Sequence, residues 1–302
     1  MFNIKIDLRK VLNVFLKSNE KDRKEFKFMS NQENLITELK EKALNIRKNI
    51  IEMVYSASSG HPGGALSIAD ILAFLYFSEL NISDINSEKR DRVILSKGHC
   101  SPALYATLAE KGIIPKEDLK GFRNINSYLQ GHPDMKKIPG VDMTSGSLGQ
   151  GLSVANGMAL AAKLDNSNYR VYCICGDGEI EEGQIWEAAM TSSHYKLDNL
   201  CVIVDNNNLQ IDGKIEDVMN SNPIDKKFES FGFNVITIDG HNFEEIKNAF
   251  KEAKKVKGKP TAIIAKTHKG KGISFMEDNV SWHGKAPNED EYKKALEELN
   301  TK

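Results

Sequence analysis

The segment VYCICGDGEIEEG (171–183) and the later segment LCVIVDNNN (200–208) together determine the fold. VYCIC is an apolar run of strand length that leads straight into the turn GDG (176–178), and CVIVD is a second such run that ends at NNN (206–208). The pattern between them predicts a helix over residues 181–195. Strand, helix and strand in this order indicate a βαβ unit, and hence a parallel sheet.

The two turns carry the side chains that point to a ligand. In a parallel sheet both turns fall at the carboxyl ends of their strands, where such folds bind ligands. Asp177 and an asparagine of the second turn offer oxygen ligands of the kind that Mg²⁺ takes together with phosphate oxygens and water. The N-terminus of the intervening helix favours a diphosphate. An Asp-Gly pair alone is a common turn, but both turns joined by one βαβ unit make a specific arrangement.

Beyond this unit, strand and helix patterns continue to alternate. Further apolar runs of strand length are residues 234–238 and 261–266. Helical patterns are predicted elsewhere over residues 34–58, 67–77, 102–110, 223–231, 243–256 and 289–299. Because no internal repeat or low-complexity linker divides this stretch, we predict one α/β domain over residues 35–302, a parallel sheet flanked by helices.

Residues 1–34 are expected to form an extension outside this domain. Residues 8–17 could form one short helix, residues 18–28 are almost wholly polar, and Met29 is an alternative start. The apolar stretch is short, interrupted by charge and without a small-residue cleavage site, which disfavours a signal peptide. A disordered or loosely docked tail is the expectation.

Composition excludes several classes of protein. The 302 residues include 41 Lys and Arg against 42 Asp and Glu, a formal net charge of -1, so no global field holds nucleic acid or an anionic membrane. No apolar run approaches the roughly 20 residues of a membrane span. Only four cysteines are present, too few for a disulfide scaffold. We therefore expect a cytoplasmic, globular protein.

Cys173 and Cys175 alternate on the first predicted strand. Their spacing resembles half of a metal-binding knuckle, but the second half is missing from the sequence. Cysteine also behaves as a small hydrophobic residue in protein interiors. We predict that both side chains are buried in the core.

Five of the seven histidines adjoin a glycine: His61, His99, His132, His241 and His283. Glycine lets a loop approach a ligand closely, and imidazole titrates near neutral pH. Several such pairs together predict a polar pocket assembled from loops. No pair of histidines has zinc-finger or H-E-x-x-H spacing, which disfavours a zinc site.

The turns GDG and NNN, about thirty residues apart, resemble the thiamine diphosphate signature, and the neighbouring motifs resemble one family, the transketolases. The motifs occur in family order: SGHPGG (59–64), RDRVILSKGHCSPALYA (90–106), GHPDM (131–135), TSGSLGQGLSVANGMALAAK (144–163), GDGEIEEGQIWEA (176–188), DNNNLQIDG (205–213) and KTHKGKG…SWHGKAP (266–287). The resemblance covers roughly residues 35–290. It implies a thiamine-diphosphate-binding fold, here the pyrophosphate-binding domain.

The resemblance also implies roles for single residues. The ligands of Mg²⁺, or of another divalent cation such as Ca²⁺ or Mn²⁺, are expected to be the side chains of Asp177 and Asn207 and the carbonyl of Leu209. Residues expected at thiamine diphosphate are His99, Gly146, Leu148, Gly178, Glu182, Asn207 and His283. Residues expected to bind the sugar and move its protons are His61, His132 and His283.

Five residues keep a second interpretation. Glu182 matches an acid buried near a subunit contact, but an acid in the first turn of a helix is favourable on dipole grounds alone. His268 and Lys269 either bind the diphosphate electrostatically or simply belong to a solvated loop. His241 is interpreted as structural, and His194 as a residue that caps its helix.

The resemblance matches only the first part of the longer members of the family. It implies the N-terminal subunit of a split transketolase, completed by a C-terminal, pyrimidine-binding subunit in a dimer of heterodimers, that is, a heterotetramer. The implied activity belongs to the pentose phosphate pathway: sedoheptulose 7-phosphate and glyceraldehyde 3-phosphate exchange a two-carbon ketol unit to give ribose 5-phosphate and xylulose 5-phosphate. Alternatives are a transketolase-like enzyme for another sugar, a 2-oxo acid dehydrogenase component, or a non-catalytic cofactor-binding subunit.

Overall fold

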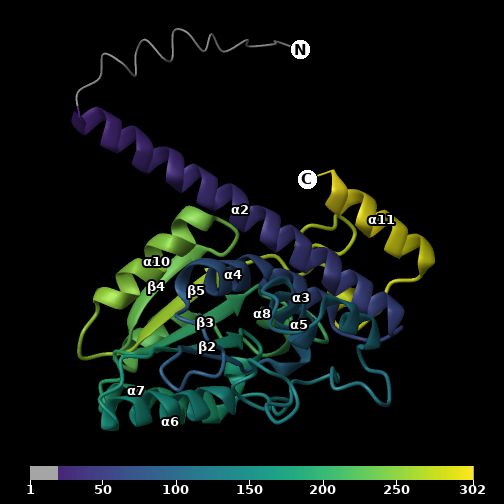
Figure 1. Ribbon diagram of the computed structural model, residues 1–302. Helices are drawn as coiled ribbons and strands as arrows, with labels where there is room; N and C mark the ends of the chain where they lie inside the picture. The colour runs from purple at the N-terminus through teal and green to yellow at the C-terminus, as the bar shows by residue number, and fades with distance from the viewer. Residues whose placement is uncertain (1–19, 302) are drawn as a thin grey trace.

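The sheet at the centre of the molecule is parallel throughout. The computed structural model describes residues 20–301, with side chains from residue 32. Within them five strands lie in the order β1-β2-β3-β5-β4. Their bounds are β1 (Arg92–Leu95), β2 (Val171–Gly176), β3 (Leu200–Asn206), β4 (Asn234–Asp239) and β5 (Thr261–Lys266). All five carboxyl ends therefore meet at one edge, and the α/β prediction is confirmed (Figure 1).

Helices cover both faces of the sheet. One face packs against α2 (Glu20–Ser56), α4 (Ala69–Phe74), α5 (Ser101–Glu110), α10 (Phe243–Lys255) and α11 (Glu289–Asn300). The other face packs against α6 (Gly151–Leu164), α7 (Gly183–His194) and α9 (Ile224–Ser230). Figure 1 shows α6 and α7 together on one side of the sheet, and α2, α4 and α10 on the other.

Shorter elements connect these layers. They are α3 (Pro62–Ser67), α8 (Ile215–Val218), a π-helical turn η1 (Leu75–Glu79), and the 3-10 turns η2 (Gly98–Cys100), η3 (Lys116–Gly121), η4 (Glu179–Glu181) and η5 (Val280–Trp282). Two of the 3-10 turns, η2 and η4, directly follow β1 and β2, at the edge where ligands bind in such sheets.

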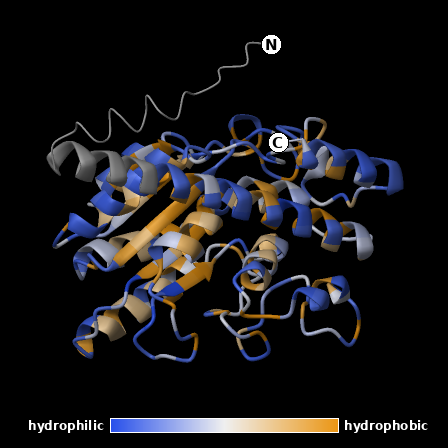
Figure 2. Cartoon of the chain, turned by 45° about the horizontal axis from the view of Figure 1, so that its top comes forward, coloured by the Kyte–Doolittle hydropathy of each residue, from blue (hydrophilic) through white to orange (hydrophobic). Residues whose placement is uncertain are grey.

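Alternation along β2 divides its side chains between the two cores. Tyr172 and Ile174 face the layer that contains α2 and α10, whereas Cys173 and Cys175 face the layer of α6 and α7. Both cysteines are fully buried and free, as predicted. Figure 2 shows the same pattern, since the strands are hydrophobic and the outer helical surfaces are largely hydrophilic. Burial on both faces explains why these strands are continuous apolar runs.

Several elements differ from the sequence-based expectations. Helix α2 begins at Glu20 instead of residue 34, because its first part is rich in helix-forming charged residues that show no apolar periodicity. The helix expected over 67–77 is broken at Ile68 and continues into η1. Strand β1 and helix α6 were not among the predicted elements, since β1 has only four residues and α6 is rich in small residues.

The structure describes only part of the extension that was expected over residues 1–34. Residues 1–19 lie outside the described part, and α2 runs through the expected boundary at residue 34 without a break. The division into 1–34 and 35–302 therefore stays a prediction. Within the described part of the chain, no helix combines the length and the apolar character that crossing a membrane requires.

Candidate functional site

A cavity of about 320 Å³ lies where the loops after β1, β2 and β3 meet. Of the residues singled out from the sequence, those that line it are His61, His99, His132, Gly146, Leu148, Asp177, Gly178, Asn207, Leu209, Lys269 and His283. They come from segments more than 200 residues apart along the chain, which the parallel sheet brings together. Glu182 is the one predicted site residue that does not line the cavity.

The register of β2 and β3 places the turns GDG and NNN side by side. Gly176 is paired with Asp205, and the Asp177 amide donates to the Asp205 carbonyl at 3.3 Å. The Asp177 carboxylate accepts from the Asn206 side chain at 3.1 Å and from the Asn208 backbone amide. Asp177 is thus held at one orientation, with a side chain only 1% exposed.

The oxygen atoms around Asp177 fit a divalent cation. Burial, helped by the negative charge of Asp205, raises the pKa of Asp177 to about 6, so the free carboxylate lacks sufficient positive charge around it. Asn207 contributes an amide oxygen fixed by the Leu209 amide at 3.1 Å, and Leu209, whose carbonyl accepts from Lys269, lines the same cavity. A carboxylate, an amide oxygen and a carbonyl are ligands that Mg²⁺ or Ca²⁺ accepts, with remaining positions left for phosphate or water.

Three imidazoles form a compact group inside the cavity. The ring centroids of His61, His99 and His283 lie 5.2–5.4 Å from one another. Burial, reinforced by neighbouring cationic groups, lowers the pKa of His61 and His99 to about 4 and that of His283 to about 3. All three rings are therefore uncharged at neutral pH and able to accept or relay a proton.

His132 completes the group of histidines. Burial also lowers its pKa, and His99 and Arg123 add to the effect. Its ring lies against Gly146, where an added Cβ would sit 3.5 Å from the imidazole. The Gly146 loop itself packs on Gly98, whose Cβ would come within 2.9 Å of the Gly146 nitrogen. Small residues at both positions let the two loops close around the cavity.

Two buried lysines face the same space. Lys97 Nζ donates to Asp205 Oδ2 at 2.5 Å and to the Gly64 carbonyl at 2.9 Å, with 3% of its side chain exposed. Burial alone would lower the pKa of Lys97, but Asp205 raises it above its usual range. Lys97 was not singled out from the sequence, because nothing in SKGH shows that this lysine is buried.

Lys269 is the second cation. Its Nζ donates to the Leu209 carbonyl at 3.1 Å and to His283 Nδ1 at 2.8 Å, and burial lowers its pKa to about 8. Of its two sequence-based interpretations, the structure supports the one that places Lys269 inside the site, because only 2% of it is exposed. Two buried cations make this part of the cavity suited to an anion.

Glu179 is a buried acid that the sequence did not single out. It accepts from Ser96 Oγ and from the backbone amides of Gly149 and Gly176, the latter two at 3.0 Å. Burial raises its pKa. Glu179 thereby ties together three loops of the cavity wall. Glu182, in contrast, is exposed at the N-cap position of α7 and makes no side-chain capping bond.

The remaining histidines lie outside the cavity. His194 is exposed in the last turn of α7, and His268 is exposed and contacts Asp278 at 2.8 Å. His241 contacts Asp70 at 2.7 Å, and both residues line a different cavity. Among the described residues, no group of three or more His, Cys, Asp and Glu side chains is placed to hold a metal ion.

Comparisons with known proteins show which family this chain resembles. The family model described as "Transketolase, thiamine diphosphate binding domain" matches residues 39–302. The 6-deoxy-6-sulfo-D-fructose transketolase subunit SqwG of Clostridium sp. (strain MSTE9) is 45% identical over 264 residues, which are 87% of this chain and 96% of that protein. One subunit of the apulose-4-phosphate transketolase of Phocaeicola vulgatus is 42% identical over 256 residues, 84% of this chain and 91% of that protein.

A solved structure extends the comparison. The crystal structure of a transketolase from Campylobacter jejuni matches with a TM-score of 0.82 and 39% identity, over 87% of this chain and 42% of that one. This chain therefore spans nearly the whole of two related subunits, but only about two fifths of the Campylobacter transketolase.

Proposed function

This chain belongs to the transketolase family, and we propose that it is the cofactor-binding subunit of an enzyme that transfers a two-carbon ketol unit from a ketose phosphate to an aldose phosphate. The specific reaction that we propose converts sedoheptulose 7-phosphate and glyceraldehyde 3-phosphate to ribose 5-phosphate and xylulose 5-phosphate. Residues 35–302 form the proposed cofactor-binding unit, and residues 1–34 an extension to it.

One observation carries the proposal: oxygen ligands, two buried lysines and four neutral imidazoles converge on a single cavity. Asp177, Asn207 and the Leu209 carbonyl would hold a divalent cation, and Lys269 lies directly beside Leu209. This combination suits a metal diphosphate, because the cation and the lysine together offset its charge. Bound there, thiamine diphosphate supplies the nucleophilic carbon and the electron sink for cleavage of the ketose C2–C3 bond.

The imidazoles have roles that follow from their neutral state. His61 and His132 are proposed to hydrogen-bond the sugar hydroxyl groups and to accept or return their protons. The Lys269 ammonium donates to His283 Nδ1, which fixes the ring proton on Nε2. His283 can therefore present an N–H donor to the sugar or the diphosphate. His99 is proposed to lie at the diphosphate.

The rim of the cavity supports a partner subunit. Ile211 lines the cavity, yet 64% of it is exposed, and Val218 and Met219 nearby in sequence are 41% and 61% exposed. Large apolar side chains at the mouth of a site are typical of a surface that another chain covers. We propose that this other chain is a C-terminal, pyrimidine-binding subunit, assembled with the present chain as a dimer of heterodimers. Glu182, exposed here, is proposed to be buried in that assembly.

The identity of the sugar is the least constrained part of the proposal, because related subunits are named for different substrates. The two subunits compared above are named for a sulfofructose and for apulose 4-phosphate. The acceptor would contact the partner as well as this chain, so substrate choice depends on both. A test must therefore offer several ketoses to the assembled complex.

The experiment is an assay of the complex purified from its host through a tag on this chain. Xylulose 5-phosphate and ribose 5-phosphate are supplied with thiamine diphosphate and Mg²⁺, and sedoheptulose 7-phosphate is measured. Parallel assays replace xylulose 5-phosphate by 6-deoxy-6-sulfofructose or by apulose 4-phosphate and measure the new ketose. We expect turnover by the complex, none by this chain alone, and loss of turnover in His61→Ala but not in the exposed-site control His194→Ala.

Three outcomes would contradict parts of the proposal. Turnover by the rigorously purified chain alone would overturn the need for a partner. Activity only with 6-deoxy-6-sulfofructose or apulose 4-phosphate would overturn the pentose phosphate reaction while retaining ketol transfer. An unchanged rate in His61→Ala would remove the proton-transfer role of that residue.

A further inference from the structure

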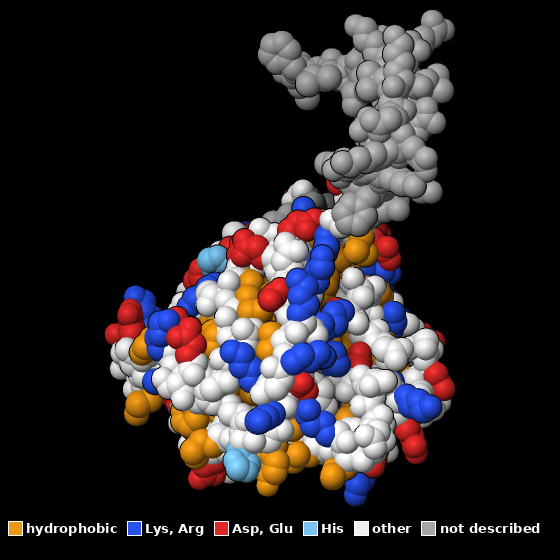
Figure 3. Space-filling model, turned by 90° about the vertical axis from the view of Figure 1, so that its left-hand side faces the viewer, with side chains coloured by type: hydrophobic (Ala, Val, Ile, Leu, Met, Phe, Trp, Pro, Cys, Tyr) orange, Lys and Arg blue, Asp and Glu red, His pale blue; other side chains and the backbone are white. Residues whose placement is uncertain are grey.

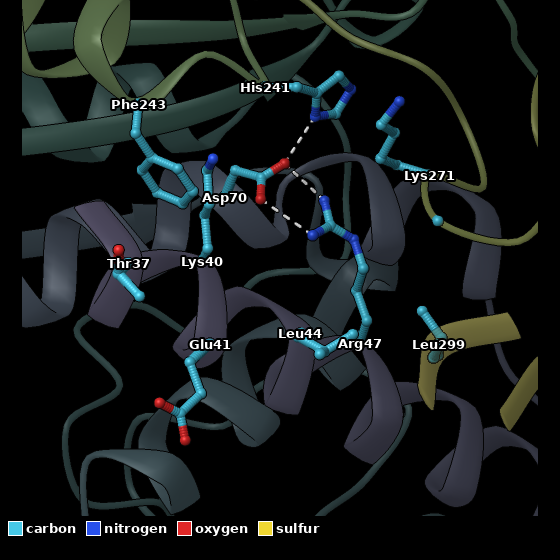
Figure 4. Close-up of a pocket in the computed structure, with 11 residues that line it drawn as sticks. Thr37, Lys40, Glu41, Leu44, Arg47, Asp70, His241, Phe243, Lys271 and Leu299 are labelled. Atoms are coloured by element: carbon cyan, nitrogen blue, oxygen red, sulfur yellow. Dashed lines mark hydrogen bonds and ion pairs between the residues drawn. The ribbon is translucent and has the colours of Figure 1, made fainter. Parts of the chain in front are cut away.

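We infer that His241 is a positioning residue for the cofactor site and acts through the backbone of the loop 267–269, which follows β5. His241 lies at a second cavity, of about 570 Å³, bounded by α2, α10 and residues 271–272 (Figure 4). None of the residues that line this second cavity also lines the cofactor cavity. That the loop serves a cofactor rests on the proposed function, whereas the effect of His241 on the loop does not.

The anchor of this arrangement is a buried ion pair between two helices. Arg47 of α2 donates from Nη1 to Asp70 Oδ1 at 2.9 Å and from Nη2 to Asp70 Oδ2 at 2.6 Å. Arg47 and Asp70 of α4 are 8% and 5% exposed, and Figure 4 shows the Asp70 carboxylate between the guanidinium and the imidazole of His241. Burial would raise the pKa of Asp70, but Arg47 and His241 lower it to about 2, so the carboxylate is ionised.

The hydrogen bonds of His241 define its tautomer. The backbone N–H of His268 donates to His241 Nε2 at 2.9 Å, so this nitrogen must carry a lone pair. The proton of the neutral ring is then on Nδ1, which donates to Asp70 Oδ2 at 2.7 Å. The Asp70 charge favours this tautomer and thereby keeps Nε2 available as an acceptor, as carboxylates do for histidines elsewhere.

The residues on either side of His268 reach into the cofactor site. Thr267 Oγ1 donates to Asp205, the buried carboxylate that also accepts from Lys97. Lys269 Nζ donates to the Leu209 carbonyl and to His283. The His268 side chain itself is exposed and bound to Asp278, so the hydrogen bond between His241 and this loop is made through the backbone of His268.

Close packing makes the connection stiff. The Gly240 amide donates to the Lys266 carbonyl at 2.7 Å, and a Cβ on Gly240 would lie 2.5 Å from Thr267 Cγ2. The ring of His241 stacks on that of His268, with centroids 5.7 Å apart and planes at 11°. A shift of the His268 backbone would therefore move Thr267 and Lys269 together, and with them the groups that bind Asp205 and His283.

Two amide substitutions separate the two bonds of His241. In His241→Asn the side-chain amide replaces Nδ1 and retains a donor to Asp70, but it is too short to accept from His268. In His241→Gln the longer side chain brings a carbonyl oxygen to the place of Nε2, where it accepts from the His268 amide. A role of His241 in general packing would make both variants equivalent, whereas the positioning role makes only the Gln variant resemble the wild type.

The test measures amide hydrogen exchange at His268 in the full chain without cofactor, followed by calorimetric titration with inorganic pyrophosphate and Mg²⁺. We expect about tenfold faster exchange and about tenfold weaker binding in His241→Asn, as for the loss of one hydrogen bond. His241→Gln should stay within about threefold of the wild type in both. His194→Asn, the same change at an exposed histidine, is the matched control and should alter neither.

Asp70→Asn provides a variant that leaves His241 in place. Without the carboxylate charge the ring can move its proton to Nε2, which then no longer accepts from His268, so exchange at His268 should again accelerate. Thermal unfolding of each variant verifies that the fold is retained. Equal exchange in His241→Asn and His241→Gln, or unchanged exchange in Asp70→Asn, would overturn the inference. If wild-type chain binds no pyrophosphate, the proposed cofactor site loses support, but the exchange data still decide the role of His241.

Discussion

The two ends of the sheet carry nearly the same ion pair in different surroundings. At the carboxyl end, Lys97 and Asp205 lie 2.5 Å apart with side chains 3% and 0% exposed. At the amino end, Lys163 and Asp198 lie 2.7 Å apart with side chains 38% and 22% exposed. The carboxyl-end pair belongs to the cofactor cavity, and the amino-end pair to a polar groove between α6 and the start of β3.

Burial, more than residue type, turns these charges into a site. At the carboxyl end Asp177 and Lys269 have pKa values moved toward neutrality by burial. The surface on the side of α10 and β4 also gathers many Lys and Arg side chains, as Figure 3 shows. Two lysines of α10 pair with glutamates on the same helix, Lys247 with Glu244 and Lys255 with Glu252. Solvated charges keep water as a partner and have little reason to bind a specific anion.

Loss of the buried pair should have the strongest consequence for folding. Lys97→Met removes the partner of Asp205, which stays buried among hydrogen bonds too weak to replace a full charge. Truncation of one member of a buried pair costs about 3–5 kcal/mol. The measurement is the free energy of unfolding in urea for the isolated chain.

Lys163→Met is the matched control at the amino end. Its exposed pair contributes less than about 1 kcal/mol, so the urea midpoint should hardly move. Equal losses in Lys97→Met and Lys163→Met would contradict the claim that burial distinguishes the two ends.

The second prediction compares the effects of removing one carboxylate at the carboxyl end of the sheet and one at the amino end. Asp177→Asn removes the charge that a divalent cation would need, while the hydrogen bonds from Asn208 and Asn206 limit the effect on folding. We expect at least about tenfold weaker binding of pyrophosphate in the presence of Mg²⁺. Asp198→Asn at the amino end should leave this affinity unchanged. Calorimetric titration of both variants measures the effect, and an equal loss in both would remove Asp177 from the proposed metal site.

The sequence predicted the parallel sheet because both faces of the sheet are covered. Burial on both sides makes β2 and β3 continuous apolar runs, and the turns that end them are recognisable. Asp177 and an asparagine of the second turn could be found for the same reason, since these turns directly follow the two runs. The four cavity histidines were singled out by their neighbouring glycines, and the choice of Asn207 and the individual roles came from the family resemblance.

Lys97, Glu179 and Asp205 were not predicted, because their role depends on partners far along the chain. Lys97 and Asp205 are 108 residues apart, and Ser96 and Glu179 are 83 residues apart. A charged residue in a sequence is exposed by default, and only tertiary structure reveals the partner that allows its burial. The contact of His241 with the His268 backbone also depends on a partner 27 residues along the chain, so it could not be predicted from the sequence, although a structural role for His241 is expected there.

The third prediction concerns pH. Burial lowers the pKa of His99 to about 4 in the folded chain, whereas the pKa of an unfolded histidine stays near its ordinary value of 6.5. Between these values the unfolded state binds more protons, so stability falls as pH falls. Removing one such group in His99→Gln should flatten the dependence of unfolding free energy on pH by up to about 1.4 kcal/mol per pH unit between 4 and 6.5.

The control for this prediction is His194→Gln, at the exposed end of α7. Urea unfolding at half-unit steps from about pH 7 to about pH 4 gives the slope for each variant. A slope in His99→Gln as steep as that of the wild type would show that burial of this imidazole does not contribute to acid lability.

Substitution of exposed apolar residues at the two ends of the sheet should have the weakest effect on folding. It is also the most direct test of the proposed partner. Ile211 lies at the cavity mouth and is 64% exposed, whereas Leu164 at the end of α6 is 79% exposed. Ile211→Asp and Leu164→Asp should each change the unfolding free energy of the isolated chain by less than about 0.5 kcal/mol, because neither side chain is buried.

If a second subunit covers the cavity, Ile211→Asp buries a charge in the complex and should weaken co-purification of the partner about tenfold, while Leu164→Asp should not. Equal retention of the partner by both variants would mean that the apolar rim of the cavity is not part of the interface.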